Sequence, residues 1–409
     1  MVYHMKYVVV VPDGMADYQL KELGCVSPMA KADKKNMNRL AEAGKVGMCL
    51  TVPPEMTPES DTANLALLGY DPLVYSRGRS PLEAASMGID MKPEDTAVRV
   101  NLVSLSDNGE PYEEKIMLDH SSGEISTDEA RVLIEAIQAE LGTEFRKFYT
   151  GVSYRHCMIW KNCFEFTDFS RPHDILGRCI KNYLPYKPES QPMTEMMKKS
   201  FEILNNHPIN VERARKGLKK ANSLWPWSPG KKAFLPCFEE KFGLKGAVVC
   251  AVDLIKGIGV CAGMEVPKVE GATGNFATNY SAKAKEAVKQ LLEKGKDLVY
   301  VHIEAPDECG HQGDAELKVK SIELIDDLVI GYIIDELKKA GEEFKLLVLP
   351  DHATPVPKRT HTRGMVPFFV YDSRNQIKNG NFIFSEKTAR NRKLRIEKGC
   401  DLMGYFLGK

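Results

Sequence analysis

The sequence predicts an α/β protein whose core is a mostly parallel β-sheet with helices on both faces. Three short apolar runs, at residues 7–11, 298–303 and 346–349, are typical of strands that are buried on both sides. Between them lie helical patterns, for example at residues 282–293 and 322–339, with apolar residues three and four positions apart. Strands that alternate with helices in this way indicate an α/β core.

The middle of the chain has a different pattern and predicts a second domain. A helix is expected at residues 127–141, with Ser126 or Thr127 as its cap and acidic residues in its first turn. The region ends in a turn-rich segment at 224–230. Because 409 residues exceed one typical core, we predict a discontinuous core of residues 1–95 and 237–409 with an α+β domain inserted at 96–236.

Composition is that of an ordinary globular protein and argues against several function classes. Apolar residues make up 43% of the chain, and 56 basic residues balance 56 acidic ones. A chain without net charge offers no global field for nucleic acid or for an anionic membrane. No stretch approaches a membrane span, and the first apolar run is too short for a signal peptide. The ten cysteines form no CxxC pair and fit a reducing compartment. We therefore expect a cytoplasmic protein with no nucleic-acid or membrane partner; the sequence leaves its oligomeric state open.

Aspartates follow the three predicted core strands. Asp13 comes directly after the first strand, Asp307 follows the second within a few residues, and Asp351 follows the third. Taken alone, an Asp-Gly pair at a strand end is more often a turn. Ligands of open α/β sheets bind outside the carboxyl ends of the strands, so these three side chains can converge there.

Histidines accompany two of these aspartates. His311 lies four residues after Asp307, in a segment whose glycines predict a turn or short loop, and His352 and His361 follow Asp351. A single histidine is more often an ordinary surface or core residue than a ligand. Carboxylates together with imidazoles are nevertheless the ligands expected for zinc or manganese, and carboxylate-rich sites also accept magnesium.

Ser60 precedes an apolar run that predicts a helix. Read by itself, it is a helix cap that accepts hydrogen bonds from free backbone N–H groups. A serine at a helix start also lies among donors that favour bound anions, which suits a nucleophile that accepts phosphate. The two interpretations are compatible.

Longer motifs extend from residue 8 to about 370: VVVVPDGMAD, PESDTANLALLGYDP, GRSPLEAASMGI, GVSYRH, PHDILG, LWPWSPG, AVDLIKGIG, PDECGHQGD and PDHATPV with THTRGMVPF. In this order they resemble the archaeal-type cofactor-independent phosphoglycerate mutases of the alkaline phosphatase superfamily. The resemblance implies an alkaline-phosphatase-like core with an inserted lid domain. It also implies interconversion of 3-phosphoglycerate and 2-phosphoglycerate, a step of glycolysis and gluconeogenesis, through a phosphoserine. Asn64 stands where family members often have histidine, which we expect to affect substrate tuning rather than the chemistry.

The resemblance further implies roles for individual residues. Ser60 would be the catalytic nucleophile. One divalent ion would be held by Asp13, Ser60, Asp351 and His352, and a second by Asp307, His311 and His361. The ions would be Mn²⁺, with Zn²⁺, Mg²⁺ or Co²⁺ as alternatives, and no bisphosphoglycerate would be needed. The partner would be a small phosphorylated substrate, anchored by residues that match family motifs or face them from the core: Arg155, His156, His173, Asp174, Arg178 and Lys256. Each of these can also be read as an ordinary surface charge.

Three other functions stay open. The first is a homoserine kinase-like phosphotransferase on the same scaffold, although the sequence has no P-loop and no kinase glycine-rich motif. The second is a metal-dependent phosphatase, in which water intercepts the phosphoserine. The third is a non-enzymatic, metal-stabilised binding protein; Ser60 argues against it, because a structural metal site gains nothing from a weak hydroxyl ligand.

Overall fold

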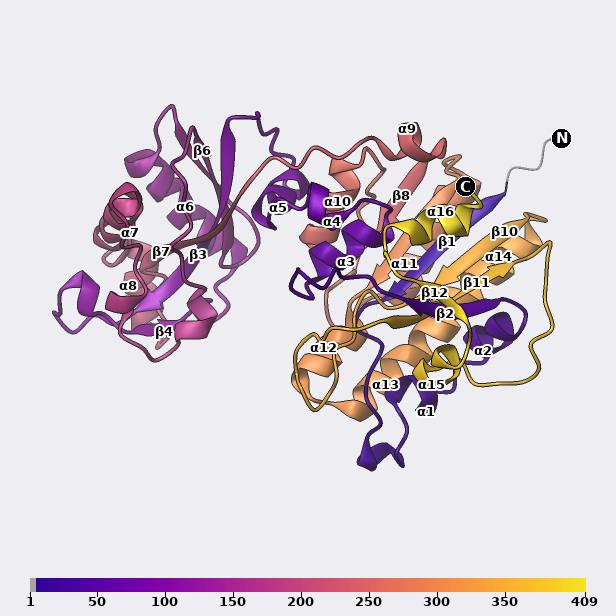
Figure 1. Ribbon diagram of the computed structural model, residues 1–409. Coiled ribbons are helices and arrows are strands. Elements are labelled where there is room, and N and C mark those ends of the chain that lie inside the picture. Colours follow the sequence, from indigo (N-terminus) through magenta and orange to yellow (C-terminus); the bar gives the residue numbers. More distant parts are fainter. Residues whose placement is uncertain (1–4) are drawn as a thin grey trace. The chain divides into compact units, whose positions relative to one another are not determined.

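The computed structural model describes residues 5–409, which divide into two compact units (Figure 1). The second unit comprises Arg77–Ala233, and the core unit comprises the described residues on either side of it. The second unit thus begins earlier than the predicted insertion at 96–236.

Helix α5 (Ser80–Ser86) explains this difference. The Arg99 N–H of β3 (Asp95–Leu105) donates to Ser80 Oγ over 3.0 Å, and Ala84 is buried in one cluster with Ala97. These contacts tie the residues before the predicted boundary to the second unit.

The core unit is built on a seven-stranded sheet with the order β12-β2-β11-β10-β1-β9-β8. Strand β11 is antiparallel to both of its neighbours, and the other pairings are parallel. This confirms the predicted α/β class with a mostly parallel sheet. The strands are β1 (Lys6–Pro12), β2 (Lys45–Cys49), β8 (Gly246–Val249), β9 (Leu298–Ile303), β10 (Phe344–Val348), β11 (Val366–Asp372) and β12 (Leu394–Ile396).

Helices cover both faces of this sheet (Figure 1). On one face, Val8 and Val10 of β1 share a core cluster with α11 (Tyr280–Leu292) and α14 (Tyr332–Lys339). On the other face, the Tyr7 ring lies edge-on to Phe406, 5.6 Å between centroids. Residues 8–11 are fully buried, as their two-sided apolar pattern predicts.

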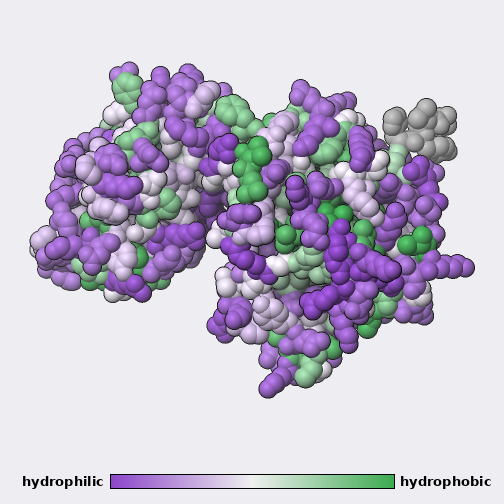
Figure 2. Space-filling view, in the orientation of Figure 1, coloured by the Kyte–Doolittle hydropathy of each residue, from purple (hydrophilic) through white to green (hydrophobic). Residues whose placement is uncertain are grey.

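The other helical elements of this unit complete the two layers. The helix expected at 322–339 consists of the end of α13, a π-helical stretch and α14. The remaining elements are η1 (Lys21–Leu23), α1 (Pro28–Lys31), α2 (Lys35–Glu42), α3 (Ser60–Leu67), α4 (Pro72–Tyr75), α9 (Phe238–Phe242), α10 (Asp253–Cys261), α12 (Ala305–Gln312), α13 (Ala315–Leu324), η6 (Ile325–Gly331), α15 (Glu386–Arg390) and α16 (Asp401–Leu407). Among the described residues, no helix is long and apolar enough to cross a membrane. Figure 2 shows hydrophilic residues over most of the visible surface, with hydrophobic residues scattered between them.

The second unit is an antiparallel sheet with α6 and α7 on one face and α5 on the other. Its central strand β3 pairs with β4, β6 and β7, and β6 also pairs with β5. The strands are β4 (Met117–Asp119), β5 (Arg146–Tyr149), β6 (Arg155–Lys161) and β7 (Ser223–Lys231), and the longer helices are α6 (Thr127–Leu141), α7 (Gln191–Leu204) and α8 (Pro208–Arg215). Helices α6 and α7 share one core cluster with the sheet.

Two local expectations in this unit had different outcomes. The helix predicted at 127–141 is confirmed as α6, and the Glu129 N–H donates to Ser126 Oγ at its start. The turn-rich reading of 224–230 is wrong, because this segment lies within β7. Successive side chains alternate between two buried clusters, as in a strand. Leu224 packs into the cluster that α6 and α7 cover, and Trp225 packs into a cluster with Trp227 and Val103.

Candidate active site

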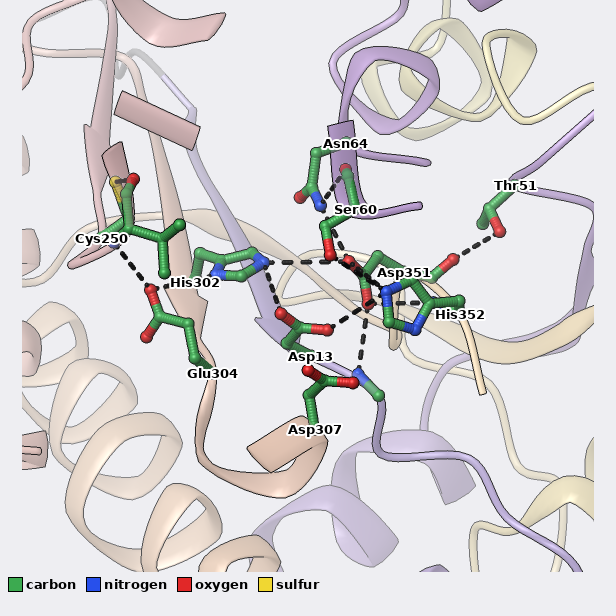
Figure 3. A network of polar contacts seen from close by, with 12 residues as sticks. Asp13, Thr51, Ser60, Asn64, Cys250, His302, Glu304, Asp307, Asp351 and His352 are labelled. Carbon is green, nitrogen blue, oxygen red and sulfur yellow. Dashed lines mark hydrogen bonds and ion pairs between the residues drawn. The ribbon is translucent and has the colours of Figure 1, made fainter. Parts of the chain in front are cut away.

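Three acidic side chains meet at the carboxyl edge of the core sheet (Figure 3). Asp13 follows β1, Asp351 follows β10, and Asp307 lies in α12, directly after β9. The Asp13 N–H donates to the carbonyl of Ile303 at the end of β9 over 2.9 Å. The Gly14 N–H donates to Asp351 Oδ1 over 3.2 Å. The main chain of the loop after β1 therefore joins all three strand ends.

Gly14 is required for this close approach. Its φ is +62°, and a Cβ at this position would lie 2.5 Å from Thr354 Oγ1 and 2.8 Å from Asp307 Cα. Gly24 also has a positive φ, of +80°, but a Cβ there would meet nothing within 4 Å. The two glycines share the backbone constraint and differ only in packing.

A Gly14→Ala variant is expected to lose more stability than Gly24→Ala. The strained backbone alone costs roughly 1 kcal/mol in both variants, and the clash at Gly14 adds roughly 1–3 kcal/mol of overpacking. Urea unfolding of the metal-free proteins measures both losses. Equal losses in the two variants would show that the Gly14 loop can move away from Asp307 without cost.

The segment that carries Asp307 and His311 is a helix rather than the predicted turn or loop. Helix α12 ends at Gly313, which adopts the left-handed conformation and caps it. The helix places the two side chains one turn apart, with His311 Nε2 3.2 Å from Asp307 Oδ2. Gly310 remains helical because its missing side chain admits the Thr354 backbone. The prediction was wrong for Gly310, which serves close packing; Gly313 does turn the chain, but only at the end of the helix.

Three imidazoles around these carboxylates are oriented in the same way. His361 Nδ1 donates to the Pro58 carbonyl over 2.7 Å, and His311 Nδ1 donates to the Arg359 carbonyl over 3.0 Å. His352 Nδ1 lies 3.2 Å from Thr354 Oγ1, whose own hydroxyl donates to Asp307 and so leaves its oxygen to accept. In each ring, Nε2 therefore faces the acidic cluster. Histidines that bind metals are typically held by such a hydrogen bond from the other ring nitrogen.

Ser60 is the first residue of α3, and its hydroxyl points into this cluster. Its Oγ lies 3.1 Å from His352 Nε2. The residue that caps α3 is Glu59, whose side chain makes no capping hydrogen bond. The capping interpretation of Ser60 is therefore not what the geometry shows, because the hydroxyl faces His352 instead of the helix N–H groups.

Asn64, one turn along α3, holds two of these groups. Its Nδ2 donates to Asp351 Oδ2 and to the Ser60 carbonyl, each over 2.8 Å, and Tyr300 Oη donates to its Oδ1 over 2.5 Å. The side chain is fully buried. Asn64 thus positions Asp351 and the start of α3, which is a different role from the substrate tuning expected at this position.

The charges of the cluster favour the binding of cations. Burial, together with the charges of Asp351 and Asp307, raises the pKa of Asp13 well above its usual range. Burial would also raise the pKa of Asp307, but the hydrogen bonds from His311 and His361 outweigh it and hold that pKa well below its usual range. The Asp307 contact raises the pKa of His311 to about 9. Buried carboxylates at this density are stable only beside positive charge.

The donor set fits divalent metal ions. Three groups have ligand atoms within 4.8 Å of one another: Asp307 with His311 and His361, Asp13 with His302 and Asp351, and Asp13 with Asp307 and His352. Asp13 Oδ1 is buried and has no hydrogen-bond partner among the described residues, as an atom reserved for an ion would be. The first group is the second predicted ligand set. The other two groups differ from the first predicted set. In one, His302 joins Asp13 and Asp351, and in the other, Asp307 joins Asp13 and His352.

The residues predicted to anchor substrate are scattered over several elements. Lys256 lies on α10 of the core unit, 3.0 Å from Asp253 Oδ1. In the second unit, the guanidinium of Arg155 lies over the Tyr154 ring, and that of Arg178 donates to Tyr183 Oη over 2.9 Å. His173 lies 3.6 Å from Asp174 and 5.6 Å from the Trp227 ring. All of these side chains are at least partly exposed.

The side chains of His156 and its neighbour Arg155 lie on opposite faces of the sheet. His156 pairs with Val100, and Arg155 pairs with Asn101. Opposed residues share a face, so His156 faces the helix-covered cluster of Val100, and Arg155 faces the other side. The His156 side chain is buried, its Nδ1 accepts from the Gly151 N–H over 3.2 Å, and burial lowers its pKa to about 3.

His156 is expected to weaken the second unit in acid. Between pH 6.5 and about 3 the unfolded chain binds a proton here and the folded chain does not, so stability falls by about 1.4 kcal/mol per pH unit as pH decreases. In a His156→Gln variant this contribution disappears. The measurement is urea unfolding followed by tryptophan fluorescence, since Trp160, Trp225 and Trp227 all lie in this unit. Above pH 7, the free energy of unfolding should depend on pH in the same way in wild type and in His156→Gln. Equal dependence in the two proteins at pH 4–6 would contradict the prediction.

Several residues of the site were missed in the sequence. Thr354 contacts Asp307 and His352, His302 lies beside Asp13, and Glu304 lies beside His302. Asn64 was noticed in the sequence, but its contact with Asp351 was not expected. One signal was available: His302 and Glu304 are polar residues at the end of a strand otherwise apolar on both faces.

Comparison with known proteins shows the family to which the chain belongs. A family model for 2,3-bisphosphoglycerate-independent phosphoglycerate mutase matches residues 41–210. A protein of that name from Methanosarcina barkeri is 44% identical over 404 residues, which is 98% of this chain and 99% of the relative. The chain belongs to this family of phosphoglycerate mutases. A Geobacter sulfurreducens relative, named a probable mutase of the same kind, is also 44% identical, over 99% of this chain and 100% of its own length.

Solved structures extend the family relationship to the fold. A cofactor-independent phosphoglycerate mutase from Thermoplasma acidophilum is 26% identical, with a TM-score of 0.65 and coverage of 99% of both chains. The PH0037 protein from Pyrococcus horikoshii is 29% identical, with a TM-score of 0.81 and coverage of 100% of this chain and 98% of that one. The expected membership of the phosphoglycerate mutase family is confirmed over the full described chain.

Proposed function

We propose that this protein interconverts 3-phosphoglycerate and 2-phosphoglycerate without bisphosphoglycerate, and that Ser60 carries the phosphoryl group. One observation supports this most directly. Among the seven predicted metal ligands, Ser60 alone carries a hydroxyl group; the others are aspartates and histidines. This hydroxyl lies 3.1 Å from His352 Nε2. A free serine is a weak nucleophile and needs such surroundings to attack phosphorus. The names of the full-length relatives supply the substrate.

Two divalent ions are part of the proposal, with Mn²⁺ preferred. Asp307, His311 and His361 would hold one, and Asp13, Ser60, Asp351 and His352 would hold the other. When bound, the ions would lower the pKa of the Ser60 hydroxyl and neutralise phosphate oxygens. The chain itself fixes the ring orientations through Pro58, Arg359 and Thr354, and Asn64 holds Asp351 beside Ser60.

The substrate's anionic groups are proposed to bind the exposed cationic side chains. Arg155 and Arg178 offer guanidinium groups suited to phosphate or carboxylate, and Lys256 and His173 offer single donors; Asp174 could hold His173 in place. His156 is left out of this set, because its buried side chain faces the helices. We also propose a cytoplasmic location, which the ten free cysteines fit.

The test is a ³¹P NMR assay of metal-loaded protein with 3-phosphoglycerate alone. The expected result is a 2-phosphoglycerate signal, with no added bisphosphoglycerate or ATP and with little inorganic phosphate. Release of inorganic phosphate as the main product would instead indicate a phosphatase. Unchanged 3-phosphoglycerate, together with ATP consumption when homoserine is added, would show that the kinase-like alternative is correct.

A further inference from the structure

His302 is a buried histidine with no role in the reaction described so far. It lies near the end of β9, and only 1% of its surface is exposed. Figure 3 shows its ring between Glu304 on one side and Asp13 and Asp351 on the other. Neither ring nitrogen makes a hydrogen bond within the part of the chain that the structure describes. A polar side chain this deeply buried and without hydrogen bonds calls for an explanation.

The Nε2 atom of His302 faces the acidic cluster. It lies 3.5 Å from Asp13 Oδ2 and 3.9 Å from Asp351 Oδ2. His352 Nε2 lies at 3.5 Å from oxygens of the same two carboxylates. Atoms that each lie about 2.0–2.2 Å from one ion are about 3–4 Å apart, which these separations match. Asp13, His302 and Asp351 also form a fully buried group that could hold an ion.

The other nitrogen of His302 faces a carboxylate that is held rigidly. Glu304 Oε1 lies 3.4 Å from His302 Nδ1 and accepts from the N–H groups of Ala251 and Val252 over 3.1 and 3.2 Å. Its Oε2 accepts from Lys283 Nζ over 2.6 Å, and Lys283 is fully buried. The carboxylate is therefore fixed in position and neutralised by a lysine that has no exposure to solvent.

We infer that His302 is a further ligand of the ion at Asp13 and Asp351, and that Glu304 is the positioning residue that holds its ring. This inference rests on the proposed two-metal site. A carboxylate on the far nitrogen of a histidine is the usual arrangement around protein-bound metals. It repeats here the pattern of His311, His352 and His361, whose Nδ1 atoms also face oxygen atoms. The ligand set at this position then has five protein side chains.

A purely electrostatic role for His302 makes the opposite prediction. If the imidazole only neutralised the carboxylates as a cation, it would compete with a divalent ion, and its removal would leave Mn²⁺ binding unchanged or tighter. If it is a ligand, its removal must weaken Mn²⁺ binding. The sign of the change therefore separates the two roles, and no substrate is needed, so the outcome is independent of whether the enzyme is a mutase.

The experiment is calorimetric titration of the metal-free, full-length protein with Mn²⁺. His302→Asn is expected to weaken one of the two binding events by at least about 100-fold and to leave the other within about threefold. Glu304→Gln, which keeps the shape of the holding group, is expected to weaken the same event by about 10–100-fold, as for other partners of metal ligands. His207→Asn is the matched control, since His207 caps α8 in the second unit and asparagine can do the same.

Two further measurements keep the result interpretable. The melting temperature of each metal-free variant shows whether it folds, and if His302→Asn does not, Glu304→Gln decides on its own. The visible absorption of the Co²⁺-loaded protein should change in His302→Asn and not in His207→Asn, because a nitrogen ligand is lost. Unchanged or tighter Mn²⁺ binding in a folded His302→Asn protein, or an unchanged Co²⁺ spectrum, would overturn the inference.

Discussion

We expect a Ser60→Ala variant to lose at least about 10³-fold in kcat, because the proposed covalent route would disappear. Its folding stability changes little, since Ser60 Oγ contacts His352 and makes no capping hydrogen bond to α3. Mutase turnover is followed by ³¹P NMR, and mass spectrometry of wild type incubated with substrate detects a phosphoryl group on the peptide that contains Ser60. The variant carries none.

Ser126→Ala is the matched control for this prediction. Ser126 is also a serine at a helix start, but its Oγ accepts the Glu129 N–H and caps α6. Its loss costs about 1 kcal/mol of stability and leaves kcat unchanged. The two variants therefore distinguish the loss of a nucleophile from the loss of a helix cap. Full turnover in Ser60→Ala would rule out Ser60 as the phosphoryl carrier, whatever the substrate is.

We expect removal of divalent ions to abolish the proposed activity and Mn²⁺ to restore it. We expect a loss of more than about 10³-fold after dialysis against a chelator, because neutralisation of the phosphoryl group and activation of the serine are lost together. Asp307→Asn removes the carboxylate shared by His311 and His361 and should reduce bound Mn²⁺ from two ions to one per chain. Metal content by atomic emission and activity on readdition of Mn²⁺ measure both effects.

The neighbouring residue of the same helix supplies the control. Glu308 carries the same charge one position further along α12, and its carboxylate accepts from Gln312 at 2.8 Å instead of entering the cluster. Glu308→Gln should keep both ions. If chelated protein stays active, or if Asp307→Asn and Glu308→Gln lose the same amount of metal, the assignment of Asp307 is wrong.

Metal binding should also tighten as pH rises. Contact with Asp307 raises the pKa of His311 to about 9. Below that pH the metal-free ring carries a proton that an ion must displace, so Mn²⁺ affinity increases from pH 6 to about 9 and binding releases protons.

The sequence predicted the features of this protein that depend on short stretches of neighbouring residues. Residues 8–11 are apolar on both faces, and a segment of that kind is stable only inside a sheet, which is where β1 lies. Ser126 or Thr127 followed by acidic residues predicted the start of α6 to within one residue. The position of Asp13, Asp307 and Asp351 after strands was also readable, since parallel strands end at one edge.

Glycine and proline misled the local reading twice. Gly310 suggested a turn, yet it lies in α12 against Thr354. Pro226 and Pro229 suggested a loop, yet they lie in β7. In both cases tertiary packing overrode a local preference that is worth only about 1–3 kcal/mol.

The α/β class, three core strands, several helices and the placement of three aspartates beyond strand ends could be read from the sequence, because periodicity and strand ends are local properties. Only the tertiary structure decided which side chains meet. Ser60 and His352 are 292 residues apart in the chain, and His302 reaches Asp13 through the pairing of β9 with β1. The direction of each imidazole likewise depends on distant carbonyls and hydroxyls. The side chains of adjacent residues such as Arg155 and His156 lie on opposite faces of a sheet, because side chains alternate along a strand. Which of the two faces is buried depends on tertiary packing.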